Sequence, residues 1–228
     1  MKELKKAWQT NFARDGIDPG IWDYEIGYIR NHELQIYTNS PENSFVENGE
    51  LVIRGIRTND PDCPYTSASL NTKNKVVFKY GKLEMTAKLP YGNGMWPAFW
   101  CMGNDIDEVG WPLCGEIDIM ELVGGRGDLR DGKGDGEYFS TIHYPNERSE
   151  CAHGLRKAVL SKGNYCDKYH KYGMVWTPET ISFYIDDIIW KTYDIKDNEF
   201  FHKPNFLLVN LAIGGGWPDA PDETTVFP

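Results

Sequence analysis

The sequence predicts an all-β fold, which we expect to be a sandwich of two antiparallel sheets. Short runs rich in valine, isoleucine, tyrosine and phenylalanine recur along the 228 residues, separated by clusters of glycine, proline, asparagine and aspartate. No long helical crossover of the kind that a βαβ fold needs lies between these runs. Because a β-sandwich of this size commonly forms one domain, we predict a single domain over residues 1–228.

The predicted strands follow one another along the whole chain. In order, they are Leu34–Thr38, Leu51–Arg57, Lys82–Leu89, Pro97–Met102, Glu116–Glu121, Tyr172–Trp176, Ile181–Ile185 and Phe206–Leu211. Polar breaks at Thr177–Thr180 and Asp186–Asp187 are typical of turns in a meander. The glycine-rich, charged segment Gly124–Gly136 is the one stretch that resembles a long insert, and we expect it to rim a site.

The composition excludes several kinds of partner. A formal net charge of -10 argues against nucleic acid, because binding to phosphates needs clustered lysine and arginine. Neither a membrane-spanning run of about 18 to 20 apolar residues nor a signal peptide is present in the sequence as given, so we expect no membrane partner. Aromatic residues make up 14% of the chain, more than a core usually needs, so some rings are expected to face a ligand.

Five cysteines are present, at positions 63, 101, 114, 151 and 166. They lack C-x-x-C spacing and have no histidine at zinc-ligand offsets, so no structural metal cluster is expected. An odd number leaves at least one thiol outside any disulfide. We favour buried free thiols, although Cys101 with Cys114 or Cys151 with Cys166 could close a loop.

One predicted strand carries three acids within six residues, at Glu116, Asp118 and Glu121. Strict alternation along a strand would point Glu121 away from the other two. One extra residue in a β-bulge near Ile119 or Met120 would return Glu121 to their face, and bulges are frequent at active sites. We therefore predict a bulge there.

The spacing of these acids is compatible with more than one role. Two carboxylates about 5 to 5.5 Å apart suit a retaining glycosidase, in which one attacks the anomeric carbon and the other acts as acid and base. Clustered carboxylates also bind calcium, and an acidic strand can simply face solvent. The spacing alone leaves these alternatives open.

The segments around this strand carry a family resemblance. The runs Trp96–Trp100, Trp111–Pro112 and Cys114–Glu121 resemble glycoside hydrolase family 16, in particular its bacterial laminarinase (endo-β-1,3-glucanase) branch. The resemblance spans most of the chain in the family's order and extends through Trp22–Gly27, Asn31–Thr38, His143–Tyr144, Trp176–Pro178 and Asn210–Gly215. It implies a β-jelly-roll sandwich with a concave substrate cleft.

By motif position, the resemblance implies that Glu116 is the nucleophile, Glu121 the acid/base and Asp118 the assisting acid. The expected reaction is hydrolysis of internal β-1,3 bonds in laminarin-type β-glucan by double displacement. Met120 is an extra residue before the second glutamate of the motif. It favours the laminarinase side of the family, because the mixed-linkage and xyloglucan enzymes lack this residue. A mixed-linkage β-1,3-1,4-glucanase, a galactan hydrolase and a carbohydrate-binding module without catalysis are the alternatives.

Further site residues are suggested by the same resemblance. His143 lies where the family has a histidine beside the acid/base, so it is a candidate catalytic residue that could hydrogen-bond Glu121 or Asp118 and help set its proton affinity; a histidine satisfied within the core is the alternative. Indole rings pack against the apolar faces of sugars, so Trp96, Trp100, Trp111 and Trp217 are candidates. Because alternation cannot place all four in the cleft, we expect Trp96, Trp100 and Trp217 there. Asn31 and Arg57 are the candidates for subsites on the non-reducing side.

The sequence departs from the family at both ends. The family's N-terminal Asp-Glu-Phe is replaced by Thr10-Asn11-Phe12, and the sequence stops at Phe227-Pro228, where relatives continue into a last strand. The family uses these positions for a structural calcium, so we expect no metal and no cofactor. A missing last strand would expose an edge that could pair with another molecule, although a monomer is expected. The polymeric substrate suggests a secreted or periplasmic protein.

Overall fold

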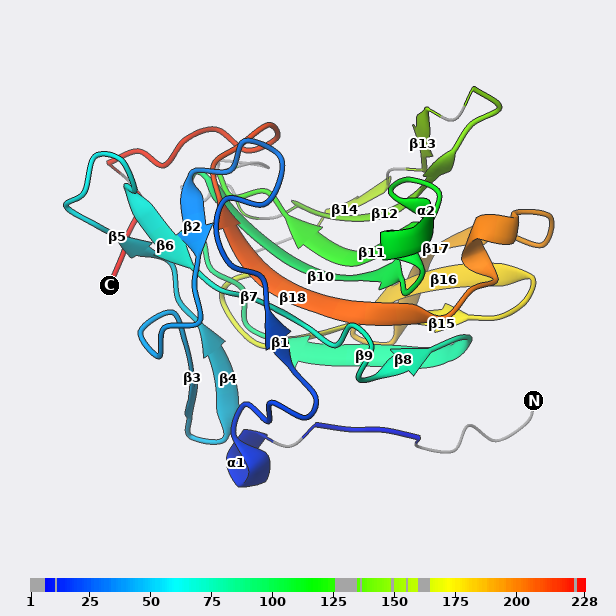
Figure 1. Ribbon diagram of the computed structural model, residues 1–228, viewed down its shortest axis with the longest axis horizontal. Coiled ribbons are helices and arrows are strands. Elements are labelled where there is room, and N and C mark those ends of the chain that lie inside the picture. The colour runs from blue at the N-terminus through cyan, green and yellow to red at the C-terminus, as the bar shows by residue number, and fades with distance from the viewer. Residues whose placement is uncertain are drawn as a thin grey trace.

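The structure is a computed structural model that describes residues 7–10, 12–125, 135, 137–148, 150–154, 156–159, 165–223 and 225–228. Two stacked antiparallel sheets make up most of it, and the long central strands of the larger sheet are curved (Figure 1). This confirms the predicted all-β sandwich. None of the helices in these ranges is long and apolar enough to span a membrane.

The larger sheet contains nine strands. Its main path runs through β1 (Asp23–Tyr24), β7 (Ser69–Asn71), β18 (Asn205–Ile213), β10 (Met95–Gly103), β11 (Glu116–Leu122), β12 (Glu137–Pro145) and β13 (Cys151–His153). Two further strands lie off this path: β8 (Val77–Phe78) pairs with β18, and β14 (Arg156–Val159) pairs with β12. The acidic strand β11 is therefore held on both sides, by β10 and by β12.

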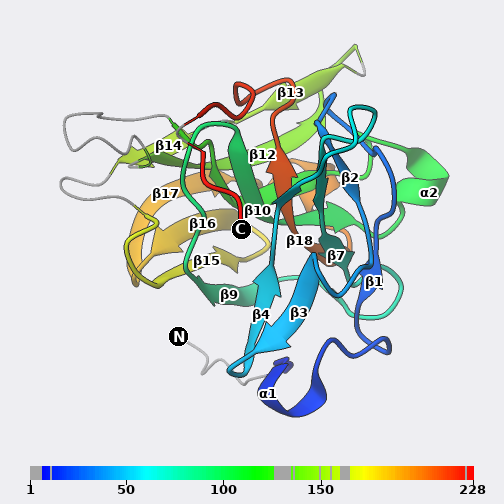
Figure 2. The same ribbon diagram turned by 90° about the vertical axis from the view of Figure 1, so that its left-hand side faces the viewer.

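The second sheet lies beneath the first in both views (Figures 1 and 2). Its four strands are in the order β17 (Ile188–Asp194), β16 (Thr180–Ile185), β15 (His170–Trp176) and β9 (Gly81–Ala87). Two small sheets complete the described strands: β2 (Gln35–Tyr37), β6 (Tyr65–Ser67) and β5 (Ile56–Arg57), and the hairpin β3 (Ser44–Glu47) and β4 (Glu50–Ile53). The helical segments are short: α1 (Phe12–Asp15), α2 (Ile106–Val109) and the 3-10 turn η2 (Glu199–Phe201).

The hydrophobic core fills the space between the two large sheets. Ile117 and Ile119 of β11 belong to one buried cluster with Phe99 of β10 and with Met174 and Trp176 of β15. Because successive side chains of a strand point to opposite faces, the alternate residues of β10 and β11 face away from this core. The core thus fixes the backbone of the strands whose other face carries the acids.

The outer face of the larger sheet is also well covered at its centre. A second buried cluster there includes Ala98, Trp100 and Met102 of β10, with Phe206 and Leu208 of β18. All nine residues of β10 are buried. This two-sided burial explains why β10 has a continuous apolar sequence rather than an alternating one.

Each of the eight predicted runs overlaps a strand of the structure, with one notable difference. The run Leu51–Arg57 is divided between β4 and β5, which belong to separate small sheets. The Arg54 N–H still bonds to the carbonyl of Asn43 at 2.8 Å, which extends the β3–β4 hairpin by one step before the chain leaves it. Gly55 also packs closely, since a Cβ at this position would lie 2.9 Å from the side chain of Ile213.

The cysteines and the glycine-rich insert can be compared with prediction only in the described residues, which include all five cysteines. No disulfide joins any two of them. Three are buried as expected, whereas Cys63 and Cys151 are half-buried. Most of the segment Gly124–Gly136 lies outside the described residues, so its expected place at the rim of a site stays a prediction.

Candidate active site

A β-bulge in β11 places the three acids on one face of the sheet. Asp118 pairs with Thr141 of β12 and Glu121 pairs with Phe139, so a step of three residues on β11 faces a step of two on β12. On the other side of β11, Asp118 pairs with Trp100 of β10 and Met120 pairs with Phe99, so the register shifts at the same place. The Ser140 hydroxyl donates to the carbonyl of Ile119 at 2.7 Å and so holds the bulged backbone. The predicted bulge is confirmed.

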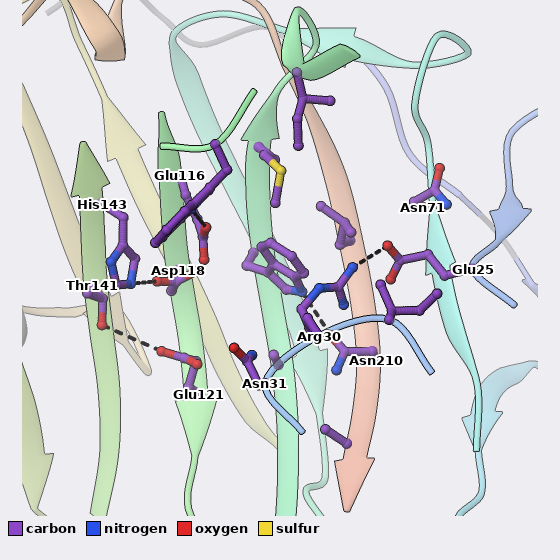
Figure 3. Close-up of a pocket in the computed structure, with 18 of the residues that line it drawn as sticks. Glu25, Arg30, Asn31, Asn71, Glu116, Asp118, Glu121, Thr141, His143 and Asn210 are labelled. Carbon is purple, nitrogen blue, oxygen red and sulfur yellow. Dashed lines mark hydrogen bonds and ion pairs between the residues drawn. The ribbon is translucent and has the colours of Figure 1, made fainter. Parts of the chain in front are cut away.

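The three acids line a cleft with a cavity volume of about 850 Å³ on the outer face of the larger sheet (Figure 3). Trp100 and Asn210 form part of its floor, from β10 and β18. The loop that follows β1 contributes Arg30 and Asn31 to the opposite side. Several segments that are distant in the sequence therefore meet around Glu116, Asp118 and Glu121.

Each acid has its own polar neighbour. The indole N–H of Trp96 donates to Glu121 Oε1 at 3.0 Å, and the Thr141 hydroxyl makes a longer contact of 3.5 Å with Oε2 of the same residue. The indole N–H of Trp111 donates to Glu116 Oε2 at 2.6 Å. These contacts hold the two glutamates in separate orientations.

Asp118 lies between the two glutamates and contacts His143. The distance from His143 Nε2 to Asp118 Oδ2 is 3.2 Å. The structure thus brings His143 to Asp118, and the hydrogen bonds described for Glu121 come from Trp96 and Thr141 instead. His143 lines the cleft and is half-buried, so it is not a histidine of the core.

Burial raises the pKa of all three carboxyl groups. The pKa of Glu116 is raised to about 8, chiefly by burial and then by the negative charge of Asp118. Burial also raises the pKa of Asp118 to about 7. The pKa of Glu121 lies well above its ordinary value, again through burial first and the charge of Asp118 second. Ionising one acid therefore makes it harder to ionise the next, and the cluster retains a proton near neutral pH.

The tryptophans of the cleft differ in how much ring they expose. Trp96, Trp100 and Trp217 all line it, as expected from the sequence. Trp96 and Trp100 are only 9% and 5% exposed, so they act mainly as walls that also orient polar groups. Trp100, for example, donates to Asn210 Oδ1 at 2.8 Å. Trp111, which was not among the tryptophans expected in the cleft, is 51% exposed and offers the most open ring.

The structure brings Asn31 into the cleft but does not bring Arg57 there. The Asn31 carbonyl accepts from the Gly216 N–H at 2.7 Å, which ties its loop to the turn that carries Trp217. The guanidinium of Arg57 instead lies over the ring of Phe227, 5.0 Å from its centroid. Arg57 ends strand β5 of a small sheet, and this position directs it away from the nine-stranded sheet that carries the cleft.

Arg30 is the cleft arginine that sequence reasoning missed. Its guanidinium lies 5.1 Å from the ring centroid of Trp100 and forms an ion pair with Glu25. Glu25 in turn accepts from the Ser69 hydroxyl at 2.6 Å. The position of Arg30, directly before the segment Asn31–Thr38 named in the resemblance, was the only signal. Other cleft residues missed in this way are Asn71, Thr141, Cys151, His153 and Asn210.

Metal ligands can be assessed for the described residues only. Two groups of three side chains are close enough to hold an ion: Glu116 with Asp118 and His143, and His143 with Cys151 and His153. Both groups line the cleft. Asn11, one of the positions on which the expectation about calcium depends, is outside the described residues. The expectation of no calcium stays a prediction.

The chain is similar in sequence to known proteins. The family model for glycosyl hydrolases family 16 matches residues 28–226. A glucan endo-1,3-beta-glucosidase A1 from Niallia circulans is 32% identical over 254 residues, which cover 96% of this chain and 36% of that protein. This chain therefore corresponds to about a third of that relative's length.

Solved structures are also similar. The laminarinase catalytic domain from Thermotoga maritima MSB8 is 38% identical with a TM-score of 0.79, covering 93% of this chain and 88% of that chain. The catalytic domain of an endo-1,3-beta-glucanase (laminarinase) from Thermotoga petrophila RKU-1 is 36% identical with a TM-score of 0.83, covering 100% of this chain and 94% of that one. The predicted family resemblance and the β-jelly-roll fold are confirmed.

The raised pKa of Glu121 predicts how its substitution changes stability with pH. A buried acid whose pKa is raised by folding keeps a proton that the unfolded chain has lost, so the free energy of unfolding falls as pH rises through this interval. Glu121→Gln, which is always neutral, should be more stable than the unmodified protein at pH 8, and the difference should shrink toward pH 5. Chemical denaturation across this range measures it.

The exposed surface variant Glu147→Gln controls for the substitution itself. A stability difference for Glu121→Gln that is the same at pH 5 and pH 8 would contradict the raised pKa.

Proposed function

The chain belongs to family 16 of the glycosyl hydrolases, and we propose that it hydrolyses internal β-1,3-glucosidic bonds of laminarin-type β-glucan with retention of configuration. The observation that carries the proposal is the bulge that gathers Glu116, Asp118 and Glu121 on one face of β11 within a cleft. The names of similar proteins, which are endo-1,3-beta-glucanases and laminarinases, support the choice of linkage.

In the first step, Glu121 acts as the acid and Glu116 as the nucleophile. The Glu121 carboxyl group gives its proton to the glycosidic oxygen while a carboxylate oxygen of Glu116 bonds to the anomeric carbon. The bond between that carbon and the glycosidic oxygen breaks, and the leaving chain departs with a new hydroxyl group. The strongly raised pKa of Glu121 suits this role, because it keeps the acid protonated near neutral pH.

In the second step, Glu121 acts as the base. Its carboxylate takes a proton from a water molecule, and the oxygen of that water bonds to the anomeric carbon while the ester bond to Glu116 breaks. Glu121 is protonated again and Glu116 is again a carboxylate. Two displacements at the same carbon retain its β configuration.

The nucleophile must be ionised although burial raises its pKa to about 8. The short hydrogen bond from Trp111 favours the charged form of Glu116. A proton held on Glu121 removes one of the neighbouring negative charges that oppose this ionisation. His143, which lies 3.2 Å from Asp118, also favours the charged form of Glu116.

The remaining cleft residues support a role in holding the glucan chain. The exposed ring of Trp111 offers an apolar face for a sugar next to the nucleophile. Arg30 and Asn31 present polar groups across the cleft and bind sugar hydroxyls in this proposal. Because the substrate is a polymer that does not enter cells, we place the enzyme outside the cell or in the periplasm.

The catalytic roles predict the outcome of substituting Glu116. Glu116→Gln keeps the size of the side chain but cannot form the ester, so release of reducing sugar from laminarin should vanish while laminarin binding persists. Product sizing for the unmodified protein should show oligosaccharides, as endo action requires. The same assay on lichenan, agarose and κ-carrageenan tests the linkage, and a preference for any of these would contradict it.

Azide can separate the roles of the two glutamates in the same experiment. With an aryl β-laminaribioside, Glu116→Ala leaves space for azide to attack from the nucleophile's side, and the product should be the inverted α-glycosyl azide. Glu121→Ala leaves space on the other side, where azide attacks the ester on Glu116 and should give the β-glycosyl azide. Exchanged products would reverse the two assignments.

The position of Arg30 predicts that it matters more for the substrate than Arg57 does. Hydrogen bonds to charged groups contribute about 1.5 to 3 kcal/mol, so Arg30→Ala should lower kcat/KM for laminarin about tenfold or more. Arg57→Ala, which changes the same side chain outside the cleft, is the matched control. An equal or larger loss in Arg57→Ala would contradict the placement of the substrate along Arg30.

A further inference from the structure

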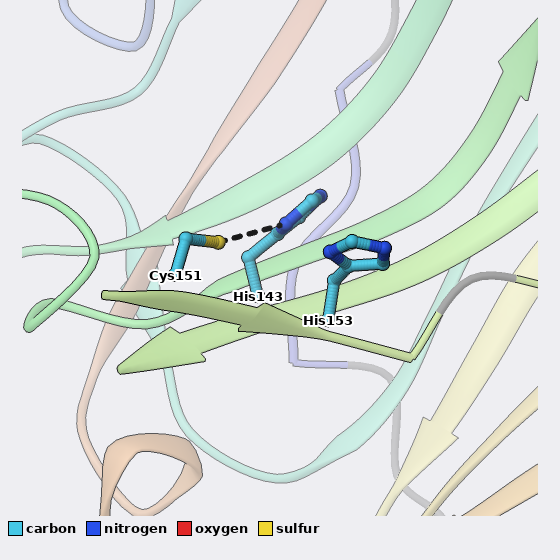
Figure 4. A group of neighbouring side chains, drawn as sticks. All are labelled: His143, Cys151 and His153. Carbon is cyan, nitrogen blue, oxygen red and sulfur yellow. Dashed lines mark hydrogen bonds between the residues drawn. The ribbon is translucent and has the colours of Figure 1, made fainter. Parts of the chain in front are cut away.

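A second group of reactive side chains lies beside the acids at the end of the cleft. His143 of β12 and His153 of β13 are direct partners across the two strands. Cys151, two residues before His153, directs its thiol toward His143, and the three side chains lie together (Figure 4). One ligand atom from each can be chosen so that all three are within 4.8 Å of one another. The proposed glycosidase chemistry uses neither Cys151 nor His153.

Thiolate and imidazole are the ligands that zinc and related transition metals prefer. Zinc bonds of about 2.3 Å to sulfur and 2.0 to 2.1 Å to nitrogen, at a tetrahedral angle, place sulfur and nitrogen about 3.6 Å apart. The observed distance from Cys151 Sγ to His143 Nδ1 is 3.5 Å. One edge of a tetrahedral site is therefore already set, and His153, which is exposed, can turn to provide the third ligand.

The other nitrogen of His143 lies near a carboxylate oxygen of Asp118, although this oxygen has no hydrogen-bond partner among the described residues. A histidine that holds a metal through one ring nitrogen usually donates the N–H of the other to a carboxylate, which fixes the ring. His143 Nε2 lies 3.2 Å from Asp118 Oδ2, while Nδ1 faces the thiol. The tautomer that accepts from the thiol at Nδ1 is the same one that would bind a metal there.

From this geometry we propose that His143, Cys151 and His153 form a binding site for a zinc-like transition-metal ion at the end of the catalytic cleft. The ion replaces the thiol proton, which is released to solvent, and forms one bond to sulfur and two to nitrogen. A water molecule fills the fourth position of the tetrahedron. Cys151 and His143 are half-buried and His153 is exposed, so the site is open to solvent for entry of the ion.

Occupation of this site should inhibit the enzyme. All three ligands line the cleft proposed to hold the glucan, and one of them contacts Asp118. The ion and its water would therefore exclude a sugar from this end and hold His143 in place. This consequence rests on the proposed function, whereas binding of the metal does not.

Cobalt and zinc binding test the site directly. The protein should bind one Co²⁺ per chain with the absorption band of a thiolate–cobalt bond, and Cys151→Ser should lose this band. Loss of a residue that only supports a metal ligand lowers metal affinity about 10- to 100-fold. Loss of a ligand itself should cost at least as much, so Cys151→Ser and His153→Ala should each weaken zinc binding at least about tenfold. Titration calorimetry with zinc chloride measures this, and a smaller loss in either variant overturns the site.

Two controls distinguish this site from zinc bound elsewhere on the chain. Cys63→Ser removes another half-buried thiol, far from the two histidines in the sequence, and should leave zinc binding unchanged. If the ion were held by Glu116, Asp118 and His143 instead, Cys151→Ser would bind zinc as well as the unmodified protein does, which also overturns the site. Circular dichroism of each variant checks that it is folded.

The effect on activity is measured as the ratio of laminarin hydrolysis with and without zinc for each protein. For the unmodified protein, the rate at saturating zinc should be at least tenfold below the rate without zinc, and a chelator should restore it. For Cys151→Ser, the two rates should differ little. Full activity of the zinc-loaded protein would overturn the inhibitory role. Because the cobalt band needs no turnover, a protein that binds cobalt as described but never cleaves laminarin would disprove only the proposed function.

Discussion

Three carboxyl groups withdrawn from water on one short strand are the constraint on which the rest of the site depends. Removing a carboxylate from water is unfavourable unless the charge is paired, hydrogen-bonded or neutralised by a proton. The structure uses all three means: indole N–H groups reach Glu116 and Glu121, an imidazole reaches Asp118, and the pKa of each acid is raised. A cluster that retains a proton at neutral pH supplies what acid catalysis of glycoside cleavage needs.

The sandwich holds this unfavourable arrangement in place. Strand β11 has β10 and β12 as neighbours, and its Ile117 and Ile119 are anchored in the core between the sheets. The bulge shifts the alternation of the residues that follow it, while Ser140 holds the bulged carbonyl and the pairing resumes after it. Functional groups on a rigid strand keep their geometry better than groups on a loop. The fold therefore contributes to function mainly by keeping β11 rigid, although burial of its carboxyl groups is unfavourable.

Much of this could be predicted from the sequence, because the controlling signals are local. Periodicity identified the central strands, and the count of residues between Glu116 and Glu121 required a bulge if the acids were to share a face. The resemblance of the motifs to a family assigned the roles. The division of Leu51–Arg57 between two sheets escaped prediction, since it depends on Gly55 packing against Ile213, which lies far along the chain.

The parts of the site that escaped prediction depend on distant contacts in the same way. Alternation shows which face a residue occupies but not what lies opposite, so the choice of Arg57 as a subsite residue had no geometric basis. The pairing of Trp100 with Asn210 spans 110 positions. Cys151 was considered only as a buried free thiol or as half of a disulfide, because its proximity to His143 becomes visible only when β12 and β13 are paired.

The stereochemistry of the first product tests the central claim, that Glu116 and Glu121 act by double displacement, most directly. Proton NMR during hydrolysis of laminarin follows the anomeric signal of newly formed reducing ends before mutarotation equilibrates them. Double displacement predicts that the β anomer forms first and the α anomer appears later by mutarotation. Initial formation of the α anomer would show a single displacement by water and would contradict the role of Glu116 as nucleophile.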